Sequence, residues 1–142
     1  MNKALIVLCI STCGIIAVSA QNVKETEVPS LVKAAFNKNY ANTHAKWEKE
    51  KDNYEVNFKK DNKMMSAVIG KTGQIIETET DMPVDELPEN VQSYLKAHYK
   101  GVKVKDAAKI VKANGEVNYE GEVNGKDVIF DKNGKFIKIA RD

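Results

Sequence analysis

The side chains best suited to chemistry in this 142-residue sequence are two histidines and a few serines, and they are scattered. His44 precedes a run of alternating charged residues, and His98 lies near the end of a stretch with helical periodicity. A metal site or a catalytic dyad needs partners at short, regular spacing, and the sequence places none beside either histidine. Ser30, Ser66 and Ser93 lack the flanking glycines of a nucleophile elbow. We therefore predict no catalytic residue and a protein that is not an enzyme.

Two pairs of glutamates are the other candidates for acid–base chemistry. Glu77 with Glu79, and Glu120 with Glu122, alternate within expected strands, so each pair shares one strand face. Such a pair can work as acid and base when a cleft raises one pKa. Short strands in a lysine-rich chain favour a solvated face instead. Residues 131–134 resemble the opening of a calcium loop, but the remaining ligands and the distal glutamate are missing. We predict no metal site and no cofactor.

The charge balance argues against nucleic acid as a partner. The chain carries 22 Lys and Arg against 20 Asp and Glu, a formal net charge of +2. Arg141 is its sole arginine, so bidentate contacts to phosphate or guanine are scarce. Scattered lysines on a nearly neutral chain are typical of a solvated surface.

The amino-terminal end predicts export. Lys3 is followed by an apolar run over 4–18, and small residues precede the expected cleavage after Ala20, so residues 1–20 are typical of a secretory signal peptide. The run is short of the roughly 20 residues that span a bilayer, and no second run follows, so we expect no membrane association after cleavage. Residues 21–27 are predicted to form a flexible leader. The expected location is periplasmic or extracellular.

A lipoprotein signal with Cys13 as the lipidated residue is the alternative. Thr12 is a poor residue before such a cysteine, and the apolar run continues past it to Val18, so ordinary cleavage is favoured. Cys9 and Cys13 both lie inside the signal, so the processed chain would have no disulfide and would depend on its core.

The rest of the chain is organised around an internal duplication. Two segments are similar in sequence: residues 27–40, EVPSLVKAAFNKNY, and residues 86–99, ELPENVQSYLKAHY. Glu, Pro, Val and Tyr occur at matching positions in both. Each copy predicts a helix opened by a proline, at Pro29 and Pro88, with an apolar stripe along one side. Strands alternate after each helix, and they are expected at 44–52, 54–58, 64–69 and 74–80, then at 102–112, 119–123, 126–130 and 135–140.

This pattern predicts an α+β fold made by tandem duplication, with each repeat a helix packed on its own four-stranded antiparallel sheet. The repeats are expected at 28–81 and 82–142. A short helix is unstable alone, so its stripe should cover the apolar sheet face. The expected contacts are those of Phe36 and Tyr40 with Val56 and Phe58, and of Leu95 and Tyr99 with Val123 and Phe130. The opposite face should look to solvent. Trp47 is assigned to the core, with an exposed binding residue as the alternative.

Three features in this order resemble the PepSY-like family, which is also described as similar to β-lactamase-inhibitor proteins. They are the V/L-P-x-x-V helix starts at Val28 and Leu87, the tyrosines Tyr40 and Tyr99 at the helix ends, and the turn at 131–135. The resemblance covers essentially the whole chain after the signal. It implies a small exported bacterial protein with two helix-on-sheet units, whose sheets join or align. Related PepSY domains are associated with holding peptidases inactive, and the lactamase inhibitors grip an enzyme with a sheet face and hairpin tips.

These observations favour an exported, non-enzymatic module that binds an unidentified protein, with inhibition of a periplasmic or secreted enzyme as the narrower hypothesis. The predicted contact residues lie on the solvent-facing sheet surface and at the hairpin tips: Glu55, Asn57, Asp61, Asn62, Glu120, Glu122, Asn124 and Gly125. One alternative is a small-ligand or metal-binding domain with a groove between the repeats. Another is an unrecognised hydrolase, which would need a pocket with converging titratable groups.

Overall fold

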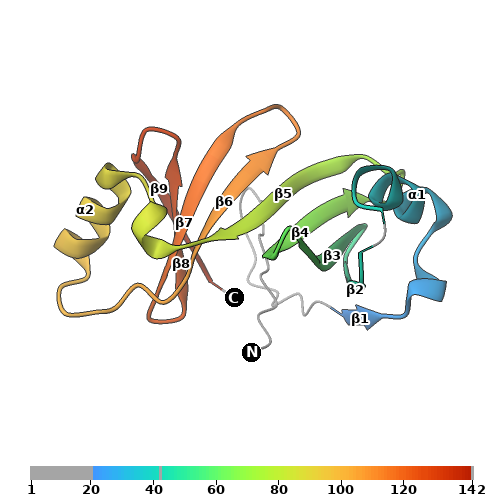
Figure 1. The fold of residues 1–142 in the computed structure, drawn as a ribbon, viewed down its shortest axis with the longest axis horizontal. Coiled ribbons are helices and arrows are strands. Elements are labelled where there is room, and N and C mark those ends of the chain that lie inside the picture. The colour runs from blue at the N-terminus through green and yellow to red at the C-terminus, as the bar shows by residue number, and fades with distance from the viewer. Residues whose placement is uncertain (1–20, 42, 142) are drawn as a thin grey trace. The chain divides into compact units, whose positions relative to one another are not determined.

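The computed structural model describes residues 21–41 and 43–141. The predicted signal peptide, with Cys9 and Cys13, lies outside them. Figure 1 shows the fold, in which short 3-10 turns precede both helices. The helices are α1 (Ser30–Asn39) and α2 (Glu89–His98), preceded by η1 (Glu25–Glu27) and η2 (Val84–Glu86). The strands are β1 (Gln21–Val23), β2 (Ala45–Glu50), β3 (Asn53–Lys60), β4 (Lys63–Gly70), β5 (Ile75–Met82), β6 (Ala107–Lys112), β7 (Val117–Val123), β8 (Lys126–Asp131) and β9 (Phe136–Arg141).

The predicted helices are confirmed to within a few residues. Pro29 and Pro88 each stand directly before the first helical residue, where a fixed φ and a missing N–H cost nothing. Both helices end alike, because the backbone N–H of Tyr40 donates to the carbonyl of Phe36 and that of Tyr99 to the carbonyl of Leu95. Residues 21–27, expected as a flexible leader, contain β1 and η1.

The predicted pair of four-stranded sheets is wrong. The nine described strands are hydrogen-bonded in the order β1–β2–β3–β4–β5–β6–β7–β8–β9, which is one sheet. The chain forms two compact units, and the boundary between Thr78 and Glu79 falls inside β5, so this strand belongs to both. The period-two pattern predicts each strand, but it says nothing about which strand edges pair. Edge N–H and C=O groups find partners wherever another strand is within reach.

The first unit has the predicted core. Val32 and Phe36 of α1 are buried against the apolar face of β2, β3 and β4. The ring centroid of Phe36 lies 5.1 Å from that of Phe58 and 5.4 Å from that of Trp47, both edge-on. Tyr40 packs on Phe58 at 4.6 Å. Trp47 is therefore a core residue, as predicted. Each such side chain contributes about 1.5–3 kcal/mol by leaving water.

The second unit repeats the arrangement with different side chains. Leu87, Val91 and Leu95 are buried with Val123 and Phe130, among others. A close approach of α2 to β7 occurs at Gly121, where a Cβ atom would lie 2.7 Å from Cδ1 of Leu95. A larger residue at this position would therefore have to displace the end of the buried Leu95 side chain.

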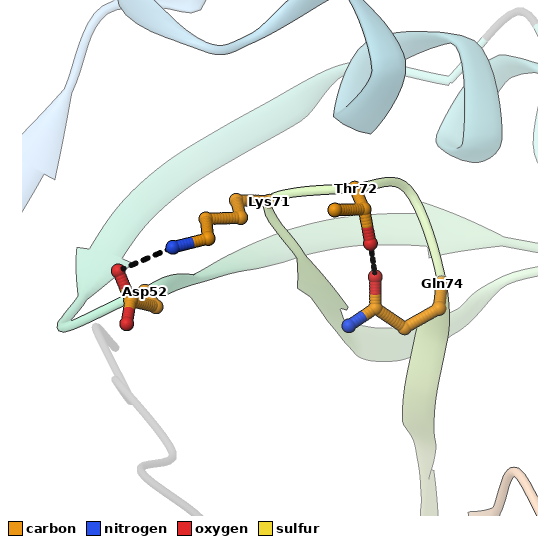
Figure 2. A network of polar contacts seen from close by, with 4 residues as sticks. All are labelled: Asp52, Lys71, Thr72 and Gln74. Carbon is orange, nitrogen blue, oxygen red and sulfur yellow. Dashed lines mark hydrogen bonds and ion pairs between the residues drawn. The ribbon is translucent and has the colours of Figure 1, made fainter.

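Two hairpin turns of the first unit are joined by exposed polar contacts (Figure 2). Nζ of Lys71, in the β4–β5 turn, lies 3.3 Å from Oδ1 of Asp52, in the β2–β3 turn, and its backbone N–H donates to the carbonyl of Asp52. The hydroxyl of Thr72 donates to Oε1 of Gln74. Both charged side chains are mostly in solvent, so we assign this network to turn structure and not to a site.

Candidate functional site

The sheet face opposite the helices carries the predicted glutamates, but they do not look to solvent. Tyr54, Val56 and Phe58 of β3 face α1, so Glu55 and Asn57 point the other way. The exposed fractions are only 4% for Glu55, 3% for Glu120 and 9% for Glu122, while Asn57 is half-buried. The solvent-facing prediction is therefore wrong for these three glutamates. Alternation decides the face on which a side chain lies, but not what surrounds that face.

Burial strongly perturbs the carboxyl of Glu55. Burial raises its pKa to about 8, and the negative charges of Glu48, Glu50 and Glu77 add to the effect. Glu48 stands directly opposite Glu55 in the β2–β3 register. The amide of Asn57 donates to Oε1 of Glu55 at 3.4 Å, which acts in the opposite direction. Glu55 therefore holds a proton at neutral pH and behaves as an interior group.

The glutamates of β7 are interior groups too. Nζ of Lys105 lies 3.5 Å from Oε1 of Glu122, and the backbone N–H of Lys105 donates to the carbonyl of Glu122 at 2.9 Å. Glu120, and Asp127 on the neighbouring strand, also have polar or electrostatic partners. These carboxylates are therefore largely shielded from solvent.

The hairpin tips are the predicted site residues that are exposed. Asp61 and Asn62 turn β3 into β4 with φ of 49° and 67°, and Asn124 and Gly125 turn β7 into β8 with φ of 53° and 68°. Two successive positive φ angles are typical of a type I′ hairpin, which Asn and Gly adopt at low cost. Of the eight predicted contact residues, these four are available to a partner.

The residues with nucleophilic or metal-binding potential remain dispersed. His44 is exposed, and His98 stacks on Tyr94 with ring centroids 3.8 Å apart while its Nδ1 lies 2.9 Å from the carbonyl of Tyr94. Ser30 and Ser93 are exposed on the helices, and Ser66 is buried in β4. Within 21–41 and 43–141, no three His, Cys, Asp or Glu side chains are placed to hold a metal ion.

The sequence analysis missed a groove beneath α2. Its volume is about 400 Å³, and α2 and the connection to β6 supply most of its lining. The predicted strand 102–112 is correct only from Ala107, because residues 102–106 have no strand structure. This connection is held to β7 by the backbone bonds Lys105 to Glu122 and Glu122 to Asp106, and it forms one wall of the groove. Val102 and Val104 alternate with polar residues as in a strand, so the sequence pattern did not indicate that they line a groove.

A second missed feature is the apolar surface of β9, the last strand in the sheet order. Phe136, Ile137 and Ile139 are 36%, 44% and 46% exposed. Ile137 is an extra residue in the ladder, since Phe130 pairs with Phe136 and Ile129 with Lys138. Phe136 stacks on Tyr94 of α2 at 5.5 Å, which places this surface on the helix side of the sheet.

The chain is similar to a known protein family and to several solved structures. A model of the family described as "Putative beta-lactamase-inhibitor-like, PepSY-like" matches the chain twice, at residues 16–76 and 69–138. No curated protein matches it. No helix in the described residues is long and apolar enough to cross a membrane.

Three solved structures from Bacteroides share the fold. One, described as "putative periplasmic proteins" of Bacteroides eggerthii, has a TM-score of 0.72 at 16% identity, over 80% of this chain and 88% of its own. A DUF2874 family protein of Bacteroides uniformis has a TM-score of 0.70 at 21% identity, over 79% and 88%. A BLIP-like protein of Bacteroides fragilis has a TM-score of 0.61 at 23% identity, over 79% and 85%. The double family match agrees with the duplication read from the sequence.

Proposed function

The chain belongs to the PepSY-like family, and from that premise we propose that it is an exported, non-catalytic protein that binds another protein. The observation that carries the proposal is the exposed apolar surface of β9, formed by Phe136, Ile137 and Ile139. Contiguous apolar surface beside an open strand edge is costly in water, and it commonly marks a site of association.

The internal duplication makes β9 unusual. Its counterpart in the first repeat is β5, which stands between β4 and β6 in the sheet, whereas β9 follows only β8. The outer edge of β9 is thus without a neighbouring strand among the described residues. The extra residue Ile137 interrupts regular pairing, which leaves 138–141 as the stretch able to accept an added strand.

The partner that fits this surface is an extended protein segment. Its backbone would pair along 138–141, while its apolar side chains would pack on Phe136, Ile137 and Ile139. Exposed lysines, Lys132 and Lys135, stand beside the strand and favour acidic residues in the partner. The exposed hairpin tips at 61–62 and 124–125 are separate contact points, one in each unit. Inhibition of an enzyme is the narrower form of this proposal, and the likeness to a BLIP-like protein supports it.

A charge-insertion experiment tests the surface. We expect the double variant Ile137→Lys, Ile139→Lys to lose the proteins that the wild type captures from a cross-linked periplasmic extract. Leu31→Lys is the matched control, because Leu31 is an isolated exposed apolar residue on α1. Sedimentation of the purified protein separates a foreign partner from a second copy. Identical capture by all three proteins would refute the role of β9.

Export has its own test. Amino-terminal sequencing of the protein recovered from the periplasm should begin at Gln21, as expected for cleavage after Ala20. A lipid-modified Cys13 at the amino terminus would replace this prediction with the lipoprotein alternative.

A further inference from the structure

We propose that the groove beneath α2 binds a small aliphatic carboxylate, a ligand with one anionic head and an apolar chain. The site is separate from the surface of β9 and belongs wholly to the second unit. Its volume of about 400 Å³ lies within the range of small-molecule sites.

The floor of the groove is apolar. Leu87, directly after η2, and Leu95 of α2 line it on one side, and Val102 and Val104 line it from the facing connection. Leu87 and Leu95 are buried, while the two valines are half-buried. Transfer of an alkyl chain onto such a floor contributes about 0.8 kcal/mol per buried CH₂ group.

The groove is preformed rather than dependent on a ligand. The amide of Gln92 donates to the carbonyls of Asp85 at 3.1 Å and Leu87 at 2.7 Å, which ties η2 to α2. The facing wall is tied to β7 through Lys105 and Glu122. A site that exists before binding avoids part of the ordering cost.

The rim of the groove favours an anion. Lys96 lines it, and Lys100 and Lys103 stand on the wall segment, all three exposed. Glu89 is the single acidic residue of the lining. The ammonium group of Lys96 beside an apolar floor complements a carboxylate attached to an aliphatic chain, and the exposed Lys100 and Lys103 add positive charge to this segment.

Two of these features differ between the repeats. The connection from α1 to β2 spans residues 40–44, while that from α2 to β6 spans 99–106 and is three residues longer. The residue that matches Lys96 in the aligned helices is Asn37. The longer connection supplies the wall, and the lysines supply the charge.

Titration with decanoate tests the proposal, using protein purified from the periplasm of an expressing bacterium. We expect saturable binding of one decanoate, seen by calorimetry, with amide shift changes confined to residues 84–104, which contain the whole lining. Lys96→Gln should weaken binding about fivefold, as expected for a charge-assisted contact in solvent. Val102→Glu, which places a carboxylate in the groove, should abolish it. Lys38→Gln, the same charge change on α1, should leave it unchanged.

Binding of decanol distinguishes the contribution of the carboxylate from that of the apolar chain. It has the same apolar chain without the charge, so it should bind more weakly than decanoate by a similar factor. Circular dichroism checks that each variant is folded. The proposal is overturned by the absence of saturable binding, by equal binding of decanol, by equal effects of Lys96→Gln and Lys38→Gln, or by shift changes elsewhere in the protein.

Discussion

The stability of the first unit should fall as the pH rises from about 5 to 9, because of Glu55. Its folded-state pKa is raised to about 8 from an ordinary 4.5, so the folded state binds this proton more tightly than the unfolded state does. The stabilisation is complete below the unfolded pKa. It is lost progressively as the pH rises towards 8, where the folded carboxyl also ionises.

The size of the effect follows from the shift. One pKa unit is worth 1.36 kcal/mol, so the shift corresponds to a stability change of at most about 5 kcal/mol. Relaxation around the ionised carboxyl lowers this upper limit, and we expect a change of about 2–5 kcal/mol. That is a large share of the total stability of a small protein. Glu55→Gln keeps the shape and cannot ionise, so it should remove this pH dependence and be the more stable protein at pH 9.

Urea unfolding at pH 5, 7 and 9 measures the difference between the two proteins directly. Titratable groups that both proteins share contribute equally to both stability curves, so the difference between the curves reports on Glu55. Glu116→Gln is the control, because the exposed carboxyl of Glu116 has a pKa lowered by its hydrogen bond from Lys112 and does not titrate in this range. Parallel stability curves for the wild type and Glu55→Gln would show that Glu55 is not a buried, protonated group.

Three further outcomes follow from packing and exposure. Gly121→Ala should destabilise by about 1–3 kcal/mol in urea unfolding, because the new Cβ meets Leu95 at 2.7 Å; an unchanged midpoint would contradict the close packing. Trp47→Ala should cost about 3–5 kcal/mol, and the buried indole should emit at short wavelength until unfolding; long-wavelength emission from the native protein would place Trp47 at the surface. Lys71→Ala should change stability by less than about 0.5 kcal/mol, since its pair with Asp52 is exposed (Figure 2); a larger loss would reveal a structural role.

The burial of Glu55, Glu120 and Glu122 changes where a partner can bind. The alternation in β3 and β7 predicts a polar face, but this polar face is not a solvated one. The structure leaves the hairpin tips exposed and adds the apolar surface of β9. Binding by this protein is therefore expected at strand ends and at an edge, rather than across the middle of a face.

The local sequence was informative wherever a short-range rule decides the structure. Pro29 and Pro88 begin the helices because their fixed φ suits a first turn, and Asn124-Gly125 makes a hairpin because both residues accept positive φ. The internal duplication predicted equivalent helices on equivalent strands, since the same pattern buries the same apolar stripe twice. The assignment of Phe36 and Leu95 to the core follows from the same periodicity.

Only the tertiary structure decided the features that depend on residues far apart in the chain. The joining of all nine strands into one sheet depends on edges finding partners, which no local pattern encodes. The pKa of Glu55 is raised first by burial and then by the charges of Glu48, Glu50 and Glu77, and these surroundings exist only once the strands are paired. The groove beneath α2 exists because residues 102–106 leave the ladder that their alternation predicts. The residue pattern within a strand or helix can be read from the sequence, whereas the residues that surround it are determined by the fold.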